Sequence, residues 1–406
     1  MRWRKEAVTV PFSVAMDDVT AGNAKVMKRD FLSSGSLAIV DQGQTLVAGY
    51  TNDISLAFKG DLPVIVFGDH TCTIKYVDFP FALGADGVRI IAPRKGYDAK
   101  FLYYYLLSSP VINTGYSRHF KYLREKRIPF VPLSEQRRIV EILDQADALR
   151  KKRAEADAKA ARILPALFYK MFGDPATNPK GWPVKRLGDP RVATVNPKFS
   201  VSNIPAEMEV SFVPMADVDE VWGRIVGTQM RPYSDVMRGF TPFQDNDVLF
   251  AKITPCMQNG KAAIARNLIN GRGFGSTEFH ILRAGPEATP EWLYALVRMV
   301  WFRKQAEASF TGTAGQQRVP ADFLIRYEVA CPPLDLQHAF AKAVSRIAEW
   351  IEQTEQVRRK TKDIFSLLLH RAFTGDLTTQ WREAHMKELL QEMEQQATAL
   401  NLRMES

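Results

Sequence analysis

The sequence has few of the residues that form disulfide frameworks or metal sites. Its three cysteines, Cys72, Cys256 and Cys331, lie far apart and form no CxxC pair. Its six histidines are scattered without HxxxH spacing. Protein metal sites need closely spaced ligands, so this pattern argues against a metal site as well as against a disulfide framework.

The sequence also lacks long apolar runs. No stretch approaches 18 uninterrupted apolar residues, the length typical of a membrane span. The first ten residues, MRWRKEAVTV, have no apolar core of the kind found in a secretory signal peptide. We therefore expect a cytoplasmic protein that does not enter a membrane.

Motifs that mark common catalytic sites are missing as well. There is no Walker lysine motif and no Asn-Pro-Pro-aromatic tetrapeptide of the kind that adenine methylation needs. GRGFGS begins at Gly271, but the following STEFHIL predicts a strand, whereas a glycine-rich cofactor loop precedes a helix. Asp69 and His70 are adjacent in GDHT, a pair more typical of a structured turn than of a catalytic dyad.

The charge balance indicates an anionic partner. The 406 residues include 54 Lys and Arg against 45 Asp and Glu, which gives a net charge of +9. Nucleic acid is the commonest partner of such a chain, although a merely basic soluble protein has the same composition. The length suggests two to four domains.

One helical pattern occurs twice. PLSEQRRIVEILDQ and PLDLQHAFAKAVSRI place Gln136 and Gln337 201 positions apart. Apolar residues follow at a spacing of three and four, which predicts long amphipathic helices over 132–173 and 333–376. Two such helices can bury each other's stripe as an antiparallel coiled coil. The predicted stripes are Ile139, Ile142, Ala146, Leu149, Ala156, Ala160, Ile163 and Leu167 in the first helix, and Phe340, Val344, Ile347, Ile351, Val357, Ile364 and Leu368 in the second.

The interruptions and ends of these helices are also predicted. Pro165 should kink or break the first helix, because proline cannot donate the backbone hydrogen bond inside a helix. MFGDP and FTGDL, which begin at Met171 and Phe373, end the two helices in a similar way. Residues 377–406 predict a shorter third helix capped by Thr379. We expect this tail to be polar, and either mobile or bound to a partner.

The segments that precede the two helices also correspond. FLYYYLLSSP at Phe101 and WLYALVRMVW at Trp292 are offset by 191 residues, as are LGADGVRII and FGSTEFHIL. β-rich runs separated by polar loops predict mixed, mostly β domains at 1–131 and 174–332. The predicted fold class is α+β, a tandem repeat of two such domains separated by the pair of helices. GWPVKRL opens the second domain, but no matching strand is evident in the first.

Basic and polar loops occur at matching places in both domains. GYSRHFKYLREKR spans 115–127 and mixes Arg and Lys with aromatic residues, SFTGTAGQQRV spans 309–319, and AKITPCMQNGK spans 251–261. Arg, Lys, Gln and Asn side chains read base edges, and Lys and Arg hold phosphates. An ordinary solvated loop can have this composition, but recurrence in both domains favours nucleic-acid binding.

With these features the chain resembles the specificity (S) subunits of type I restriction-modification systems. The resemblance is carried by PLSEQRRIVEILD and PPLDLQHAFAKAV, each preceded by a variable domain and followed by a long helix that ends in FGD or FTGDL. IVFGDHTCTIKYVDFPFALGADG with GYSRHFKYL looks like one target recognition domain, and GFTPFQDNDVLFAKITPCMQNGKAAI with GFGSTEFHILR looks like another. One departure is Leu336, which stands where the first helix has Glu135. We therefore expect a weaker charge interaction at the start of the second helix.

The resemblance implies a DNA-recognition subunit without catalytic activity. Each domain would bind one half of an asymmetric, bipartite site on double-stranded DNA, and the helices would hold the two domains at a fixed separation. The chain would dock two methyltransferase (M) subunits, which carry S-adenosylmethionine, and through them the restriction (R) subunits, which cleave DNA with ATP and Mg²⁺. The chain itself would bind no cofactor.

The residues expected to contact DNA lie in the polar loops of the two domains. In the first domain we predict Asp69, His70, Thr71, Arg118, His119 and Lys121, and in the second Lys252, Thr254, Gln258, Lys261, Gln316, Gln317 and Arg318. Two other classes of protein are alternatives: a coiled-coil scaffold that does not bind DNA, and a methyltransferase or nuclease with a fused specificity module. The second needs a catalytic domain, and no unassigned block of the chain is large enough for one.

Overall fold

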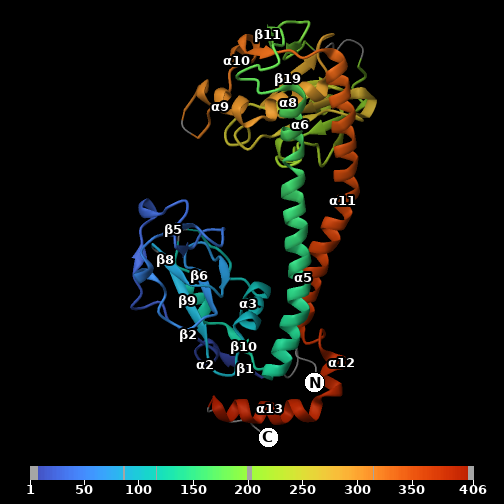
Figure 1. Ribbon diagram of the computed structural model, residues 1–406. Helices are drawn as coiled ribbons and strands as arrows, with labels where there is room; N and C mark the ends of the chain where they lie inside the picture. The colour runs from blue at the N-terminus through green and yellow to red at the C-terminus, as the bar shows by residue number, and fades with distance from the viewer. Residues whose placement is uncertain (1–7, 86, 116, 199–203, 314, 401–406) are drawn as a thin grey trace. The chain divides into compact units, whose positions relative to one another are not determined.

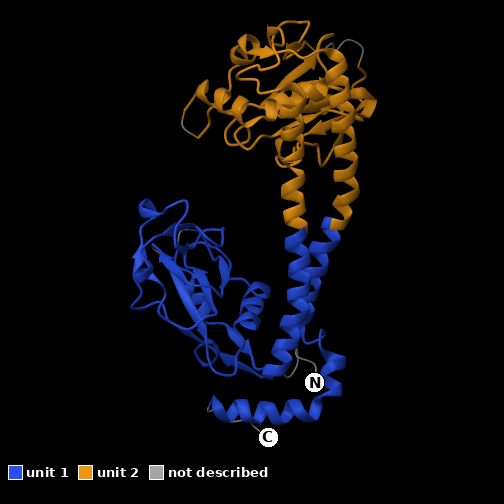
Figure 2. Cartoon of the chain, viewed as in Figure 1, with its two compact units in different colours: residues 1–152, 358–406 blue, residues 153–357 orange. Residues whose placement is uncertain are grey.

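The chain forms two compact units (Figure 2). Unit 1 comprises Met1–Lys152 and Arg358–Ser406, and unit 2 comprises Arg153–Val357. The computed structural model in Figure 1 describes residues 8–85, 87–115, 117–198, 204–313 and 315–400.

Two long helices belong to both units. Helices α5 (Leu133–Ala160) and α11 (Leu334–Thr374) each contribute one part to unit 1 and the other part to unit 2. Their existence confirms the two predicted helices. Over the described part of the chain, no helix combines the length and apolarity that crossing a membrane would need.

Unit 1 is built on two four-stranded sheets and a two-stranded ribbon. Its strands are β1 (Thr9–Pro11), β2 (Met16–Asp18), β3 (Lys25–Val26), β4 (Leu37–Val40), β5 (Gly49–Thr51), β6 (Val64–Gly68), β7 (Ile74–Val77), β8 (Phe81–Gly84), β9 (Val88–Pro93) and β10 (Arg127–Pro129). The first sheet, β2-β9-β6-β7, is antiparallel throughout. In the second sheet, β3-β8-β4-β5, β8 runs parallel to β3 and β4. The ribbon pairs β1 with β10.

Unit 2 repeats this plan. Its strands are β11 (Val184–Arg186), β12 (Ala193–Val195), β13 (Glu209–Val213), β14 (Gln229–Pro232), β15 (Thr241–Gln244), β16 (Val248–Ala251), β17 (Ala262–Ile264), β18 (Arg272–Gly275), β19 (Phe279–Ala284) and β20 (Glu328–Ala330). The order β12-β19-β16-β17 matches the first sheet of unit 1, and β11 pairs with β20 as β1 pairs with β10. The second sheet, β14-β13-β18-β15, keeps one parallel pair, β13 with β18, but its edge strand β15 is antiparallel.

The opening strand that the sequence did not reveal in the first domain is β1. It is three residues long and pairs with β10 in the register Val10 to Ile128. Such a short strand carries too little alternation to be recognised, and tertiary pairing supplies its structure. With β1 in place, the repeat and the α+β fold class predicted from the sequence are confirmed.

The strand β6 shows why these apolar runs become strands. All five of its residues are buried. Because side chains alternate across a strand, Ile65 and Phe67 join the core on the helix side, while Val64 and Val66 join the core between the two sheets. Each unit is therefore a sandwich of two sheets with helices against one outer face.

Helices close the outer face of the first sheet in each unit. Unit 1 contains α2 (Phe12–Ala15), α3 (Ala99–Ser108), α4 (Phe120–Arg124), α12 (Thr379–Ala384) and α13 (Met386–Ala399), with 3-10 turns η1 (Lys28–Asp30) and η2 (Ile54–Leu56). Unit 2 contains α6 (Ile163–Phe172), α7 (Tyr233–Val236), α8 (Pro290–Arg298), α9 (Val300–Ala308) and α10 (Ala321–Arg326), with η3 (Met215–Asp217) and η4 (Ile269–Gly271).

The long helices pack in opposite directions within each unit. In unit 1, Arg150 near the middle of α5 lies over the ring of Phe365 on α11, with the guanidinium carbon 4.6 Å from the ring centroid. In unit 2, the ring of Phe340 near the start of α11 lies 6.0 Å from that of Phe168 on α6. Arg153 of α5 lies over Trp350 of α11 at 5.8 Å. Residue numbers rise along one helix as they fall along the other, so the antiparallel prediction is confirmed within each unit.

The predicted apolar stripes are only partly buried along the stretch where α5 and α11 pack together: Ile139, Ala146 and Ile351 are buried, whereas other stripe residues are exposed. Aromatic rings beneath arginines replace an aliphatic seam there, and Leu143 and Phe365 are buried instead of their stripe neighbours. Periodicity identified the helices but could not identify the face that each domain covers. The stripe residues found exposed are Leu149, Ala156, Ile163, Val357 and Ile364.

The first predicted helix is broken rather than continuous. Ala161 and Arg162 separate α5 from α6, and Pro165 is the third residue of α6. The ring of a proline conflicts with the carbonyl four positions earlier, which here belongs to Ala161. Backbone N–H groups in the first turn of a helix have no partner within the helix, so a proline without an N–H is tolerated there. A new helix therefore starts just before Pro165.

The described part of the C-terminal tail is held by contacts within unit 1. Helices α12 and α13 pack on unit 1, with Leu389 and Ala397 buried. The N-cap of α12 is Thr378 rather than the predicted Thr379. Apolar side chains of α13 are buried against unit 1. The sequence of a short polar helix does not predict such packing.

A buried glutamine joins each domain to its long helix. In unit 1, the Oε1 of Gln136 accepts a hydrogen bond of 2.8 Å from the N–H of Asp98, the N-cap of α3. Its Nε2 donates to the carbonyls of Gly96 and Val131. The side chain is fully buried.

Gln337 makes the same three bonds in unit 2. Its Oε1 accepts from the N–H of Thr289, the N-cap of α8, at 2.9 Å. Its Nε2 donates to the carbonyls of Glu287 and Pro332, each at 2.9 Å. Gln136 and Gln337, which match in the sequence, therefore form equivalent connections between a domain and its long helix. We call each connection a joint.

Replacement of Gln337 by alanine should destabilise unit 2. The change leaves three buried backbone groups without their partner, and we expect the free energy of unfolding to fall by about 2–4 kcal/mol. Urea unfolding followed by tryptophan fluorescence measures this. The control is Gln353→Ala, at an exposed position of the same helix. Equal stability of the two variants would contradict a stabilising role for the hydrogen bonds of Gln337.

Candidate nucleic-acid interface

Three loop segments meet in unit 1: residues 41–44 after β4, residues 69–73 after β6, and residues 113–119 before α4. The N–H of His119 donates to the carbonyl of Asp69 at 2.9 Å, which ties the third segment to the second. The hydroxyl of Thr71 donates to the carbonyl of Gln42 at 2.6 Å, which ties the second to the first. The sheet thus anchors a surface made of loops.

Asp69 and His119, both predicted to contact DNA, are buried at the centre of this cluster. The Asp69 carboxylate accepts from the N–H of Phe120 at 2.8 Å. The N–H of Thr114 donates to Nε2 of His119, so Nδ1 carries the hydrogen and donates to the carbonyl of Asp69 at 2.9 Å. These two residues hold the 113–119 loop in place and do not face a ligand.

His70 and Thr71 are half-buried at the edge of the same cluster. The backbone N–H of His70 donates to the Gln42 amide oxygen at 3.2 Å, and its ring Nδ1 lies 3.2 Å from the carbonyl of Ser117. The Thr71 hydroxyl is used within the cluster. His70 therefore keeps part of its ring at the surface, whereas Thr71 serves the fold of the turn.

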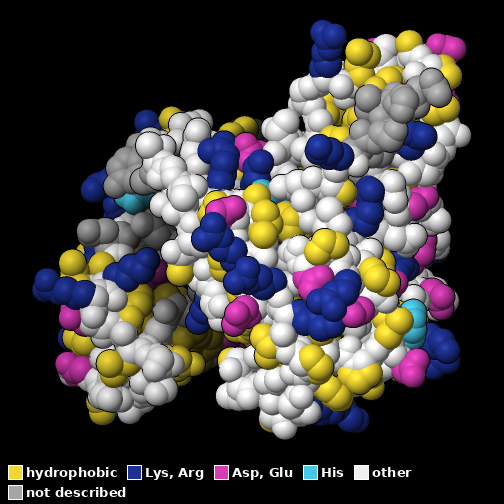
Figure 3. Space-filling model, turned by 90° about the horizontal axis from the view of Figure 1, so that it is seen from above, with side chains coloured by type: hydrophobic (Ala, Val, Ile, Leu, Met, Phe, Trp, Pro, Cys, Tyr) yellow, Lys and Arg dark blue, Asp and Glu magenta, His cyan; other side chains and the backbone are white. Residues whose placement is uncertain are grey.

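Arg118 and Lys121 supply the exposed positive charge of this surface. Both are exposed, and the Lys121 ammonium lies over the ring of Tyr122, 4.8 Å from its centroid. Arg124 follows on the same short helix and is also exposed. Lys and Arg side chains are spread over the face drawn in Figure 3, among acidic and hydrophobic ones. On the face in view, the basic side chains drawn do not form one continuous patch.

The second domain brings five predicted residues together. The N–H of Thr254 donates to the carbonyl of Gln317 at 3.0 Å, and the N–H of Val319 donates to the carbonyl of Lys252 at 2.9 Å. The turn after β16 is thereby paired with the segment that precedes α10. Gln316 is exposed beside the pair, and Lys252, Gln317 and Arg318 are half-buried. The Thr254 hydroxyl is buried and has no hydrogen-bond partner among the described residues.

Glu278 fixes the orientation of Arg318. The Arg318 guanidinium donates through Nε and Nη2 to the Glu278 carboxylate, at 2.9 Å for each closest contact, and through Nη1 to the carbonyl of Gln316 at 2.9 Å. The hydrogen bonds from Arg318 lower the pKa of Glu278, so the pair is ionised at neutral pH. A forked pair of this kind gives the guanidinium one plane and one direction.

Gln258 and Lys261 do not join this group. Gln258 donates to the Glu307 carboxylate at 2.5 Å. The Lys261 ammonium donates to the carbonyl of Met215 at 3.2 Å, just beyond β13. Lys75 of unit 1 does the same beyond β4, donating to the carbonyl of Asp41 at 2.6 Å. Lys261 therefore matches a structural lysine that braces the neighbouring loop.

Sequence reasoning missed Gln42, Gln44 and Glu278. Gln42 links the backbone of His70 to the 41–44 segment, and Gln44 is exposed beside it. The sequence carries a faint signal, because DQGQT follows a run of apolar residues as a loop follows a strand. Glu278 had no such signal, since its pairing with Arg318 joins segments 40 positions apart.

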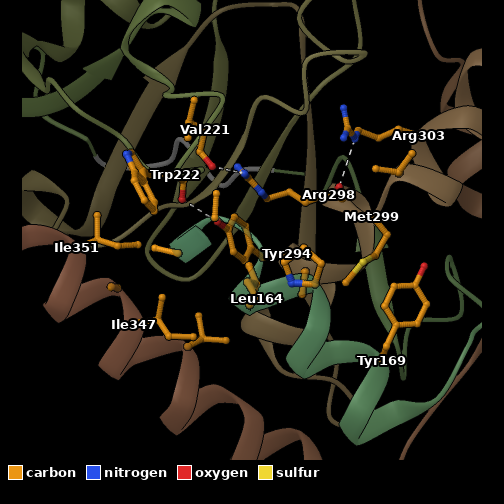
Figure 4. Close-up of a pocket in the computed structure, with 17 residues that line it drawn as sticks. Leu164, Tyr169, Val221, Trp222, Tyr294, Arg298, Met299, Arg303, Ile347 and Ile351 are labelled. Atoms are coloured by element: carbon orange, nitrogen blue, oxygen red, sulfur yellow. Dashed lines mark hydrogen bonds between the residues drawn. The ribbon is translucent and has the colours of Figure 1, made fainter. Parts of the chain in front are cut away.

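A separate cavity of about 260 Å³ lies in unit 2 beside the break between α5 and α6 (Figure 4). None of its 17 described lining residues is Asp, Glu, His, Cys, Ser or Thr. Its polar groups bind the surrounding backbone: the Tyr294 hydroxyl donates to the carbonyl of Trp222 at 3.1 Å, and Arg298 donates to the carbonyl of Val221 at 2.8 Å. The cavity therefore lacks the groups of a hydrolytic site.

Sequence comparison bears directly on the first of these surfaces. Residues 17–157 match the family model of the type I restriction modification DNA specificity domain. This stretch is therefore similar to the specificity domains of type I restriction-modification systems. The match contains all three segments that meet in unit 1. Unit 2 lies almost wholly outside it, yet unit 2 repeats the strand order of the specificity domain.

Curated relatives of the chain are specificity subunits. It is similar to the type I restriction enzyme EcoEI and EcoAI specificity subunits of Escherichia coli, with 32% identity over 199 residues and 34% over 201. Each alignment covers 49% of this chain and 33% of the relative. The match thus spans about a third of the length of these relatives.

A solved structure extends the likeness in fold to most of the chain. It is that of the type I restriction-modification system S subunit from M. genitalium, with a TM-score of 0.52 and 13% sequence identity. The superposition covers 91% of this chain and 96% of the other. The specificity domain and its repeat in unit 2 therefore share the fold of an S subunit.

Acidification should lower the stability of unit 2 through the buried His280. This buried ring lies on β19, where Asn196 donates to Nδ1 at 3.0 Å and Nε2 donates to the carbonyl of Val319 at 2.8 Å. Burial lowers the pKa of His280 below its ordinary value of 6.5. Nearby Lys252 lowers it further and Glu278 opposes the shift.

The folded state therefore favours neutral His280, and its contribution to stability is lost as the pH falls from 6.5 towards the depressed pKa. We expect the urea midpoint of unit 2 to fall between pH 7.5 and 5.5, and His280→Gln to flatten this change. His338→Gln, at an exposed position, is the control. The same slope in both variants would exclude His280 as the cause.

Proposed function

We propose that this chain is the DNA sequence-recognition subunit of a type I restriction-modification complex. The observation that carries the proposal is the repetition, in unit 2, of the fold of the specificity domain together with its loop surface. In unit 1 the turn after β6 is held against the segment before α4, and in unit 2 the turn after β16 is held against the segment before α10. Two surfaces built alike but lined by different residues suit an asymmetric site with two unlike halves.

The exposed and half-buried side chains of these loops are the proposed DNA contacts. In the first domain they are His70, Arg118, Lys121 and Gln44, and in the second Lys252, Gln316, Gln317 and Arg318. Arginine and glutamine recognise guanine and adenine through paired hydrogen bonds in the major groove, while lysine binds phosphates. The buried or internally bonded members of the original set are positioning residues: Asp69, Thr71, His119, Thr254, Gln258 and Lys261.

The chemistry of modification and cleavage belongs, in this proposal, to partner subunits. Two M subunits would dock on the long helices and carry S-adenosylmethionine, and R subunits would cleave with ATP and Mg²⁺. The chain itself would contribute recognition and no catalysis. Its α5 and α11 would set the number of unread base pairs between the two half-sites, since a rigid antiparallel pair has a fixed length.

Sequencing of methylated DNA tests the proposal. Cells that express the chain with its cognate M subunit should modify one bipartite sequence, and cells that express the M subunit alone should not. Absence of sequence-specific modification, together with no binding of duplex DNA at low salt by the assembled complex, would favour a protein-binding scaffold. Methyl transfer or cleavage by the purified chain alone would favour the enzyme alternative.

Substitution of Arg118 or Arg318 by alanine should weaken binding of the cognate duplex by about 1–3 kcal/mol if each reads a base. Discrimination should relax at one position of one half-site only, a different half for each variant. Competition binding with single-base variants of the site measures this in the assembled complex. Lys159→Ala, which removes an exposed charge from α5, should change neither. Equal losses on every sequence would instead identify phosphate contacts.

A further inference from the structure

The C-terminal tail completes the joint of the first domain through contacts that the described residues of the second domain do not repeat. Figure 1 shows α13 crossing below β1 and the start of α5, and both segments belong to unit 1. Leu389 and Ala397 of α13 are buried, and Met393 and Leu400 pack against the same core. The core that receives them includes Phe101 of α3, so the tail covers the domain as well as the helix.

Gln396 of α13 donates to the same two carbonyls as Gln136. Its Nε2 lies 2.7 Å from the carbonyl oxygen of Gly96 and 3.2 Å from that of Val131. Gly96 has a φ of +93°, and a Cβ there would lie only 3.0 Å from the Gln396 side chain. A glycine is therefore required for this approach. Within the described residues of unit 2, the equivalent carbonyls of Glu287 and Pro332 receive their side-chain amide from Gln337.

A buried ion pair adds a second connection between the tail and the start of α5. The Glu135 carboxylate accepts from the Thr378 hydroxyl at 2.5 Å and from Nε of Arg382 at 2.8 Å. Glu135, Thr378 and Arg382 are all buried residues. Glu392 accepts from the N–H of Ser134 at 2.9 Å, in the first turn of α5. Since Leu336 replaces Glu135 in α11, the ion pair belongs to the first joint alone.

From these contacts we infer that residues 377–400 form a clasp that holds the first domain on α5. Gly96, Val131 and the first turn of α5 make up the joint, and the clasp adds a second donor to each of the two carbonyls that Gln136 binds there. Gln396, Glu135 and Arg382 are thus positioning residues for the first recognition surface. The consequence for DNA recognition rests on the proposed function: loosening the clasp should relax reading of the first half-site and leave the second unchanged.

Hydrogen exchange on the full-length chain tests the clasp without DNA. Gln396→Glu keeps the size of the side chain but removes its N–H donors. We expect peptides that contain 96–101 and 131–139 to exchange about tenfold faster, while 287–293 and 332–340 stay unchanged. Gln395→Ala, an exposed neighbour on α13, is the matched control. No difference from this control, or an equal increase in both units, would overturn the clasp.

Truncation after Asp376 and the change Arg382→Met extend the test to the ion pair. Arg382→Met leaves Glu135 buried with one fewer donor, and we expect it to accelerate exchange in the same two peptides of unit 1. If the truncated chain fails to fold, the two single substitutions still decide the matter. Normal exchange at 131–139 in both single variants would exclude a role for the tail in this joint.

Mismatch penalties measured with the assembled complex test the consequence for recognition. Gln396→Glu should reduce, several-fold, the penalty for mismatches in the half-site read by the first domain, and leave penalties in the other half unchanged. Faster hydrogen exchange together with unchanged mismatch penalties in both half-sites would overturn the consequence for recognition. The clasp itself would still be supported. Lack of sequence-specific binding by the unmodified complex would overturn the proposed function, and the exchange result would still decide the clasp.

Discussion

The structure depends on one repeated arrangement, a buried glutamine near the start of each long helix. The amide of Gln136 or Gln337 is both acceptor and donor, so it can bind the N-cap N–H of the preceding short helix and two carbonyls at once. A glutamate has no donor for the carbonyls, and its charge would be buried without a cation. An asparagine is one methylene shorter. The residue type and its position therefore fix how each sandwich meets its helix.

This frame leaves the recognition loops free to vary. In unit 1 the loops are held by Asp69 and His119, which bind backbone groups, and in unit 2 by backbone pairing between 252–254 and 317–319. Neither solution involves the glutamine joint or the strand order of the first sheet. Two domains can then keep one fold while the side chains at their surfaces diverge, which an asymmetric recognition protein requires. The clasp on the first joint shows that even the frame is reinforced differently in the two halves.

Local signals in the sequence were enough to predict the helices and the repeat, because caps, proline and periodicity act within a few turns. Pro165 led to the break at Ala161 and Arg162, and the matched glutamines marked the joints. Leu149 and Ile364 failed as core residues, because the face a helix buries is set by the partner and not by its own pattern. The strand β1 was missed since three residues carry no period, and the tail was misplaced since its partners lie hundreds of positions away.

The structure separates the predicted site residues by burial, which the sequence could not do. Asp69 and His119 have the chemistry of contact residues but are buried, while the exposed Gln44 attracted no notice. Burial of a loop residue depends on which segments meet, and those contacts join positions such as 69 and 119 or 278 and 318. Sequence spacing reveals repeats at 191 and 201 positions because the two copies share one order of elements. It gives no information on contacts between loops within one copy.

The pairing of Arg318 with Glu278 has a consequence for how such a surface discriminates. A free guanidinium binds any phosphate, and phosphate contacts add affinity without sequence information. If Arg318 contacts DNA as proposed, Glu278 would neutralise part of that attraction and, by holding the guanidinium plane, would make binding depend on a base edge that matches its direction. The ion pair is partly exposed, so its own contribution to stability is small. In the proposed function its effect would be to lower general affinity and raise selectivity, and selectivity decides whether a recognition protein finds its site among many competing sequences.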